Sequence, residues 1–250
     1  MEADPELGPL SLDRLTRDVW VYQRVRGHRF SSDDLVTALV AAEVAPTATR
    51  VLDLGCGLGT VLLHLAWTLP AARLVGVEAQ AVSFELLRRN VDHNRLGDRV
   101  TIHHGDLREP AVQAALGGDF PLITGTPPYF PPGAALDADD AQRAYARVEY
   151  RGGVEAYLAA GAALLAADGV MVLCGAGGAD ARVQAGAAAV GLHVHARCEV
   201  HPRAGEPPLF AVWTVRRTAG ACAATTMTLR DAAGARTADA HRLKVFAGLA

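Results

Sequence analysis

A glycine-rich bend follows one of the apolar runs of the chain and is the first feature whose residue types suit ligand chemistry. Residues 51–60 read VLDLGCGLGT, with an acid at Asp53 and glycines at Gly55, Gly57 and Gly59. Glycine permits positive φ and lets a ligand approach the backbone, while a helix that begins after the bend presents free N–H groups. The alternate spacing departs from the G-x-G-x-x-G pattern that suits a dinucleotide pyrophosphate. The segment therefore predicts a strand, a binding loop of another kind and a helix.

Two further acids follow the next predicted strands. Glu78 comes directly after the strand expected at 73–77, where an α/β fold places an acid whose two oxygens suit the vicinal diol of a ribose. Asp106 follows the strand expected at 100–104, in the string His104-Gly105-Asp106-Leu107. Either acid alone would be read as an ordinary surface carboxylate. After the glycine bend, both are candidates for contacts with a nucleoside.

A rigid corner follows the strand expected at 121–124. It reads Gly125-Thr126-Pro127-Pro128-Tyr129-Phe130, and two adjacent prolines fix the backbone. Open α/β sheets bind ligands in the crevice beyond the carboxyl ends of their strands, so we expect the aromatic side chain to reach this crevice. A proline pair by itself indicates only a stiff loop. Its place after a strand, downstream of the glycine bend, predicts a substrate site.

The elements that must position these residues alternate between β-rich apolar runs and helical patterns, which is typical of a parallel sheet with crossover helices. Strands are expected at 50–54, 73–77, 100–104, 121–124, 169–174, 194–200 and 209–215, with the last two antiparallel. Helices are expected from Leu35 onward and at 61–69, 81–96, 111–116, 154–167, 179–190 and 238–249. The small residues of 218–226 predict a loop before a last strand at 227–230.

Bulk composition limits the class of protein. Half of the 250 residues are apolar, enough for one α/β domain with a modest extension. The four cysteines are far apart and lack metal-ligand spacing, so we expect reduced thiols, no metal site and a cytoplasmic location. The N-terminal residues MEADPELGPL do not have the basic and apolar pattern of a secretory signal. The apolar run 156–167 is too short for a membrane span, so no membrane association is expected.

Charge distribution leaves the role of residues 13–30 open. The formal net charge of −3 argues against tight nonspecific binding of nucleic acid. Residues 13–30 nevertheless hold five arginines against two aspartates, with Trp20, Tyr22 and Phe30 interleaved. Such a segment can grip phosphate and stack on a base, or it can be a solvated amphipathic segment.

The glycine bend and the proline corner together resemble a known family. The string Asp-Leu-Gly-Cys-Gly-Leu-Gly is similar to motif I of S-adenosylmethionine-dependent methyltransferases, and Thr126-Pro127-Pro128-Tyr129 resembles the Asn-Pro-Pro-Tyr motif of amino methyltransferases. Residues 30–34, FSSDD, resemble the segment that caps the methionine end of the cofactor in the small-domain (MTS) type. The resemblance implies a class I, Rossmann-like doubly wound fold with a mostly parallel seven-stranded sheet and helices on both faces. It also implies a capping segment at residues 1–34 and a methyltransferase domain at 35–250.

The same resemblance assigns roles to individual residues. For S-adenosylmethionine it implies contacts from Phe30, Ser32, Asp33, Asp53, Gly55, Cys56, Gly57, Gly59, Glu78, Asp106, Leu107 and Thr126. For catalysis it implies Thr126, Pro127, Pro128 and Tyr129, with the first two accepting hydrogen bonds from the target amine and the aromatic ring stacking on the target plane. Threonine stands where the family has asparagine, and its hydroxyl accepts one hydrogen bond but also donates.

Several stretches beyond the motifs resemble the bacterial enzymes that methylate an adenine amine of valine tRNA. They are ARVE at 146–149, VHPRAGEP at 200–207 and the segment that begins with TLRDAAG at residue 228. This resemblance implies N-methylation of an exocyclic amine of a nucleic-acid base, with tRNA as the partner and S-adenosylhomocysteine as the product.

Three other functions are compatible with the residues. A protein methyltransferase acting on a glutamine amide would use the same corner, although such enzymes usually carry an additional N-terminal domain. A small-molecule methyltransferase would suit the acidic net charge and Thr126. A noncatalytic scaffold with a cofactor fold is the non-enzyme alternative, but it has no need for an acid at each cofactor contact.

Overall fold

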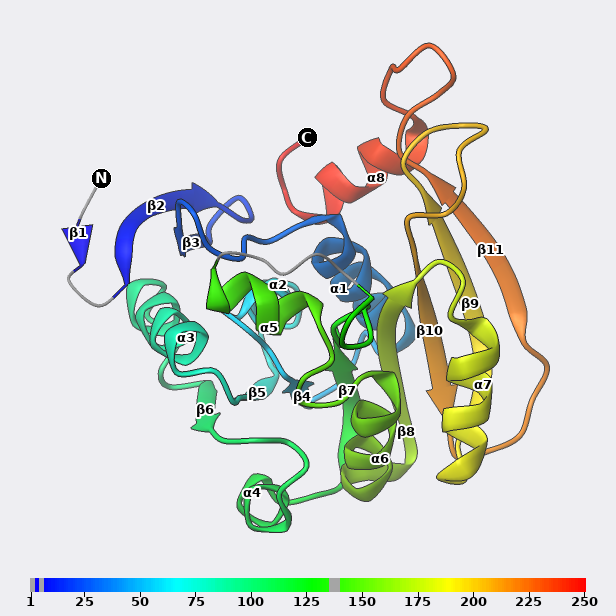
Figure 1. The fold of residues 1–250 in the computed structure, drawn as a ribbon, viewed down its shortest axis with the longest axis horizontal. Helices are drawn as coiled ribbons and strands as arrows, with labels where there is room; N and C mark the ends of the chain where they lie inside the picture. The colour runs from blue at the N-terminus through cyan, green and yellow to red at the C-terminus, as the bar shows by residue number, and fades with distance from the viewer. Residues whose placement is uncertain (1–2, 5–6, 135–139) are drawn as a thin grey trace.

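The computed structural model describes residues 3–4, 7–134 and 140–250. Its centre is a sheet whose strands lie side by side in the order β11 (Ala223–Thr228), β9 (His193–His201), β10 (Phe210–Arg216), β8 (Leu165–Ala176), β7 (Phe120–Gly125), β4 (Arg50–Leu54), β5 (Arg73–Glu78) and β6 (Val100–His104). Strand β10 is antiparallel to both of its neighbours, and the other pairs in this sheet are parallel (Figure 1). This arrangement confirms the predicted doubly wound α/β class.

The family resemblance implied a seven-stranded sheet, but this sheet has eight strands. Residues 223–228 form edge strand β11 parallel to β9, where a loop was expected up to residue 226. The side chains of 223–226 are exposed, so β11 has no apolar alternation that would mark it as a strand. Backbone pairing with β9 decides its structure, and that pairing is not visible in local sequence.

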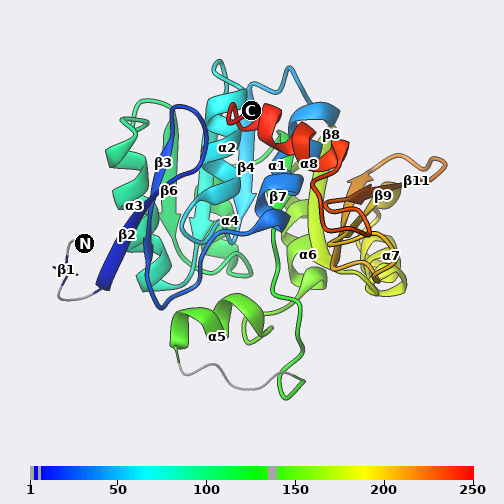
Figure 2. The same ribbon diagram turned by 90° about the horizontal axis from the view of Figure 1, so that it is seen from above.

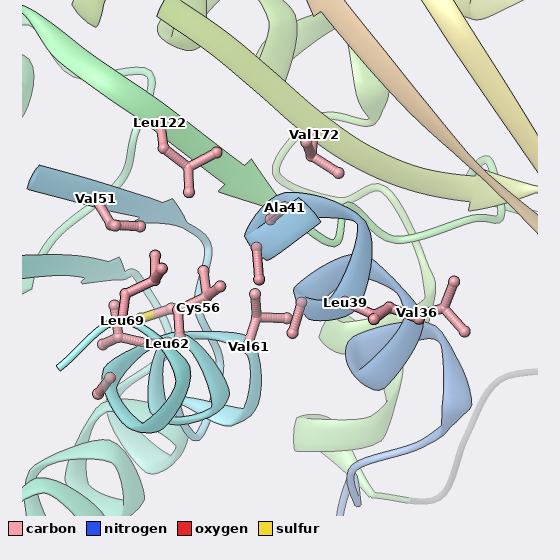
Figure 3. Close-up of a cluster of buried hydrophobic side chains, with 14 of the residues drawn as sticks. Val36, Leu39, Ala41, Val51, Cys56, Val61, Leu62, Leu69, Leu122 and Val172 are labelled. Atoms are coloured by element: carbon pink, nitrogen blue, oxygen red, sulfur yellow. The ribbon is translucent and has the colours of Figure 1, made fainter. Parts of the chain in front are cut away.

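Helices cover both faces of the sheet. One face carries α1 (Ser32–Val44), α2 (Thr60–Thr68), α3 (Ala81–His93) and α8 (Ala238–Phe246). The other carries α4 (Pro110–Leu116), α6 (Val154–Leu164) and α7 (Asp180–Ala189). Figure 3 shows the first core, where α1 and α2 pack beneath β4, β7 and β8 through side chains such as Leu62, Leu122 and Val172.

Alternation along the strands divides the apolar side chains between the two cores. In β10, Val212 packs in the first core and Trp213 in the second. Because both faces are covered, the central strands are nearly continuous apolar runs, as the sequence indicated. The helix expected at 154–167 is shorter, because it ends at Leu164 and β8 begins at Leu165. Its alanine-rich end has no periodicity that separates helix from strand.

The N-terminal residues form a second sheet that the sequence did not predict. It contains β1 (Ala3–Asp4), β2 (Gly8–Arg14) and β3 (Trp20–Arg24), and Figure 2 shows β2 and β3 beside α3. Residues 1, 2, 5 and 6 of the proposed 1–34 segment lie outside the described residues.

Two asparagines, one in α3 and one at its C-terminal cap, fasten this sheet to the main domain. Asn90 accepts a hydrogen bond from Tyr22 N at 2.6 Å and donates to Tyr22 O at 3.1 Å. Asn94, one turn later, makes the same pair of bonds with Trp20 N and O at 2.9 and 2.7 Å. Each amide takes the place of a neighbouring strand, so α3 satisfies the free backbone groups of β3.

A short helix that the sequence did not predict lies over the carboxyl edge of the sheet. Helix α5 (Ala141–Arg147) begins at Asp140, whose side chain accepts a hydrogen bond from Arg143 N. Figure 2 shows α5 standing apart from the helix layers. Among the described residues, no helix has the length and apolar character required to cross a bilayer.

Candidate functional site

The glycine bend between β4 and α2 is held in place by the acid that follows β5. Glu78 accepts hydrogen bonds from Gly57 N at 2.8 Å and from Gln80 N at 2.6 Å. Its side chain is buried, and this burial raises the pKa of Glu78. One carboxylate therefore fixes the bend and still has acceptor lone pairs for a ligand at the sheet edge.

Two glycines of the bend need their lack of a side chain for different reasons. Gly55 has φ of +58°, and a Cβ there would collide with the hydroxyl end of Tyr157 on α6. Gly57 has φ of +57° with open space where a Cβ would stand. Tyr157 also packs against Gly125, so the aromatic ring closes the floor between β4 and β7. Sequence reasoning missed Tyr157, because only the fold brings α6 to the glycine bend.

A pocket at this edge gathers most of the residues predicted to hold the cofactor. Its lining includes Phe30, Gly55, Cys56, Gly57, Glu78, Asp106, Leu107 and Thr126. It also includes residues that the sequence did not single out, such as Gln80, Ser83, Tyr145 and Arg151. We call it the cofactor pocket.

The structure places four other predicted cofactor residues outside the lining of this pocket. Ser32 and Asp33 border two other depressions, described below. Gly59 precedes α2 with φ of +94°, so its left-handed backbone requires glycine, and a Cβ there would also meet the end of the Leu87 side chain. Asp53 is buried beneath the bend.

Asp53 is a titratable group inside the sheet. Its Oδ1 accepts a hydrogen bond from the Thr124 hydroxyl at 2.8 Å, and its Oδ2 has no partner in the described part of the chain. Burial raises the pKa of Asp53 to about 7, although the Thr124 bond opposes the shift. The carboxyl group of Asp53 therefore titrates near neutral pH, where ordinary aspartates are fully ionised.

This shift predicts a pH dependence of stability. The pKa of Asp53 lies above its ordinary value of 3.8, so the folded chain keeps a proton that the unfolded chain has released, and the free energy of unfolding falls as pH rises from about 4 to 7. Between pH 5 and pH 8 the loss from this group is about 3 kcal/mol. The variant Asp53→Asn removes the titrating group, and with it this pH dependence, while keeping an oxygen that accepts the hydrogen bond from Thr124.

Urea unfolding of the ligand-free protein and of Asp53→Asn at pH 5 and pH 8 checks this expectation. The stability of the wild type relative to the variant should be lower at pH 8 than at pH 5. Burial also lowers the pKa values of His28 and His64, but both proteins share those histidines and their contribution cancels. If the unfolding free energies of wild type and Asp53→Asn changed equally between pH 5 and pH 8, Asp53 would be ionised over that whole range and the expectation would be wrong.

Asp106 is an ionised acid at the far side of the pocket. Arg108 binds its two oxygens at 2.9 and 2.7 Å, and the hydrogen bond from this side chain is the main reason why the pKa of Asp106 is lowered. Leu107 beside it is buried and supplies an apolar wall.

The proline corner after β7 borders a second pocket. Thr126, Pro127, Tyr129 and Phe130 line it, while Pro128 faces the cofactor pocket. The Tyr129 hydroxyl donates to Asp33 Oδ2 at 2.8 Å and lies 3.1 Å from Cys174 Sγ. The corner therefore positions the aromatic ring at the sheet edge, and Asp33 at the start of α1 fixes its hydroxyl. We call this second depression the acceptor pocket.

The two pockets meet at the threonine of the corner. Thr126, His28, Asp34 and Ala146 line both of them. Asp34 accepts a hydrogen bond from Ser31 N at 3.1 Å, and burial raises its pKa well above the ordinary value, with a further contribution from the charge of Asp33. Burial lowers the pKa of His28, so its ring is neutral at pH 7. Sequence reasoning missed the place of His28 at this junction, and no local signal marks it.

The acceptor pocket is basic at its rim. The exposed side chains of Arg26, Arg143 and Arg147 line it, and none of the three forms an ion pair within the described residues. Arg147 lies over the ring of Phe130 at 5.6 Å from its centroid. The volume of about 530 Å³ is in the usual range for ligand pockets. In the described ranges, no group of three or more His, Cys, Asp or Glu residues is arranged to hold a metal ion.

Comparisons with known proteins identify relatives of this chain. The model of the family "Methyltransferase small domain" matches residues 28–143, which include the glycine bend and the proline corner. A tRNA1(Val) (adenine(37)-N6)-methyltransferase of Yersinia pestis (strain Pestoides F) is 31% identical over 192 residues, covering 75% of this chain and 74% of the relative.

Other relatives match over shorter stretches. The protein with that same name from Porphyromonas gingivalis (strain ATCC 33277) is 33% identical over 123 residues, 49% of this chain and 48% of the relative. A release factor glutamine methyltransferase of Geobacter sulfurreducens is 44% identical over 88 residues, 35% of this chain and 28% of the relative. The chain thus spans about half of the Porphyromonas relative and less of the Geobacter one.

A solved structure supports the fold. The predicted O-methyltransferase of Agrobacterium tumefaciens superposes with a TM-score of 0.65 at 19% identity, covering 87% of this chain and 98% of that one. This likeness concerns the fold alone. With three quarters of the Yersinia relative covered and the small-domain model matching both halves of the site, the chain belongs to the methyltransferase small-domain family.

Proposed function

We propose that this protein transfers a methyl group from S-adenosylmethionine to the exocyclic amine of an adenine in tRNA. The observation that carries the proposal is the junction at Thr126, where a nucleoside-type pocket and a basic-rimmed pocket share one wall. A group-transfer enzyme needs its donor and acceptor to meet at one point in this way. The relatives from Yersinia and Porphyromonas carry the corresponding name.

The residues of the cofactor pocket fit an aminoacyl nucleoside. Glu78 offers carboxylate oxygens to a ribose diol, and Asp106 with Leu107 offers an acceptor and an apolar wall to a purine. The open space at Gly57 admits a ligand against the backbone. The buried carboxyl group of Asp34 suits a positive charge of the ligand. S-adenosylmethionine, when bound, supplies a methyl group that its positive sulfur already activates.

The junction residues have roles in preparing the acceptor nitrogen. An exocyclic amine conjugated with a ring is a poor nucleophile, and hydrogen-bond acceptors favour a geometry in which its lone pair is free. The Thr126 hydroxyl is one such acceptor. The neutral ring of His28 is a second acceptor. We assign to it the hydrogen bond with the target amine that an asparagine side chain would otherwise accept.

The acceptor pocket favours a nucleic acid over a protein amide. Arg26, Arg143 and Arg147 surround it without carboxylate partners among the described residues, and arginine is suited to phosphate groups. A glutamine amide in a protein would require no such charge. Methylation of a protein glutamine is the second candidate, which the match to the Geobacter relative supports over a shorter stretch.

A labelling experiment tests the function. The purified protein is incubated with S-adenosylmethionine labelled in its methyl group and with total tRNA, a protein extract or a metabolite fraction from a strain that lacks its gene. We expect label in tRNA as N6-methyladenosine, identified after digestion to nucleosides. Label in protein or in metabolites instead of tRNA would contradict the proposed acceptor but not the methyltransferase chemistry.

A further inference from the structure

A third depression, beside helix α8, has a chemistry that the methyl-transfer site does not use. Four cationic side chains line it, namely Arg14, Arg230, Arg236 and Lys244, and its floor includes Leu35 and Leu243. It lies where α8 packs against α1, and Figure 2 shows these two helices side by side. We call it the α8 groove.

The charge of the α8 groove contrasts with that of the whole chain. The net charge of the protein is −3, yet no carboxylate lines the groove. Arg14 donates to the carbonyls of Thr16 and Arg17, and Arg230 donates to the carbonyl of Gly234. In the part of the chain that the structure describes, none of the four cations forms an ion pair. The charge of Asp18 interacts with Arg14 from outside the groove, so the lining of the groove itself carries only positive charge.

The floor of the groove contains a buried polar atom without a partner. The side chain of His64 on α2 borders the groove and is 2% exposed, and its Nδ1 has no hydrogen-bond partner within the described residues. Burial lowers the pKa of His64 to about 4, so the ring is neutral at pH 7 and can donate from one nitrogen and accept at the other. Between apolar side chains, this ring suits a hydroxyl-bearing ligand with an apolar face, such as a ribose with its base.

The α8 groove adjoins both pockets of the proposed active site. Phe30 lines the groove and the cofactor pocket, and Ser31 lines the groove and the acceptor pocket. The acceptor pocket, which Arg26, Arg143 and Arg147 line, therefore adjoins the groove at Ser31. A chain of phosphates that leaves the acceptor pocket meets the four cations next.

We propose that the α8 groove binds a single-stranded polynucleotide segment next to the acceptor base, with phosphates on Arg14, Arg230, Arg236 and Lys244 and sugars or bases over the apolar floor. The inference rests on the proposed function, because it identifies the occupant as part of the same RNA substrate. It explains how a protein of negative net charge holds RNA, since Arg14, Arg230, Arg236 and Lys244 gather in one groove that no carboxylate lines.

Charge reversal in the groove tests the proposal. The double variant Arg236→Glu/Lys244→Glu is compared with the control Arg50→Glu/Arg73→Glu, whose residues are exposed at the opposite end of β4 and β5 and which changes the net charge equally. Binding to a fluorescent single-stranded RNA of about 15 nucleotides is followed by anisotropy at two salt concentrations. We expect the groove variant to bind at least about tenfold more weakly with a reduced salt dependence, and the control to stay within about twofold of wild type.

The outcomes separate the groove from the proposed function. Equal RNA affinities of wild type and groove variant would overturn the proposal that the α8 groove binds RNA, whether or not the RNA becomes methylated. If RNA binding depended on the groove but the RNA never accepted label from S-adenosylmethionine, the proposed RNA site would be supported and the proposed acceptor would be overturned. Polyglutamate that binds as tightly as the RNA would assign the groove to an acidic protein and overturn the proposal. The affinity of the groove variant for S-adenosylmethionine, measured by calorimetry, should equal that of wild type and reports that the variant is folded.

Discussion

Replacing Glu78 by alanine should weaken the binding of S-adenosylmethionine about 100-fold, which equals about 2.7 kcal/mol. The carboxylate accepts hydrogen bonds from Gly57 N and Gln80 N, so its loss leaves two backbone donors of the binding loop without partners. It also removes the proposed acceptor for the ribose. Each of these charge-assisted bonds contributes about 1.5–3 kcal/mol, and their loss is not fully additive. Isothermal titration calorimetry measures the change.

Two companion variants make the result specific. Glu78→Gln keeps one acceptor oxygen and should bind with intermediate affinity. Glu85→Ala removes a carboxylate that pairs with Arg88 on the surface of α3, and it should bind like wild type. If Glu78→Ala bound the cofactor within about threefold of wild type while unfolding normally, the pocket at the glycine bend would not be the cofactor site.

Tyr129→Ala should lower kcat for methyl transfer by about 10²–10³-fold and leave the affinity for S-adenosylmethionine unchanged. Tyr129 lines the acceptor pocket and not the cofactor pocket, so its removal affects the position of the acceptor alone. The hydrogen bond to Asp33 fixes the ring, which restricts the orientations that the acceptor base can adopt. Single-turnover rates with saturating cofactor and tRNA measure this effect separately from binding.

Tyr129→Phe separates the ring from its hydroxyl. This variant loses the contacts with Asp33 and Cys174 but keeps an aromatic face, so it should retain most of the activity of wild type. Full activity of Tyr129→Ala on the true acceptor would contradict the role of the ring. A cofactor affinity that falls together with kcat would instead indicate that the corner shapes both pockets.

The sequence determined the chemistry-bearing segments because each of them is local. The acid and alternate glycines of 53–59 specify a bend that requires positive φ at Gly55 and Gly57, and both residues have it. The apolar runs at 50–54 and 100–104 form strands with the predicted bounds. Parallel strands end at one edge, so the order of the elements also predicted that Glu78, Asp106 and Thr126 line one pocket.

The tertiary structure alone decided the features that depend on contacts between distant segments. The N-terminal sheet is attached to the main domain where Asn90 and Asn94 bond to β3, and strand β11 pairs with the edge of β9. The junction of the two pockets joins His28 and Asp34 to a threonine about 90 residues later, and nothing in either local sequence marks that contact. Periodicity and turn chemistry act over a few residues, whereas burial, the shifted pKa of Asp53 and the charge of the α8 groove are properties of the packed chain.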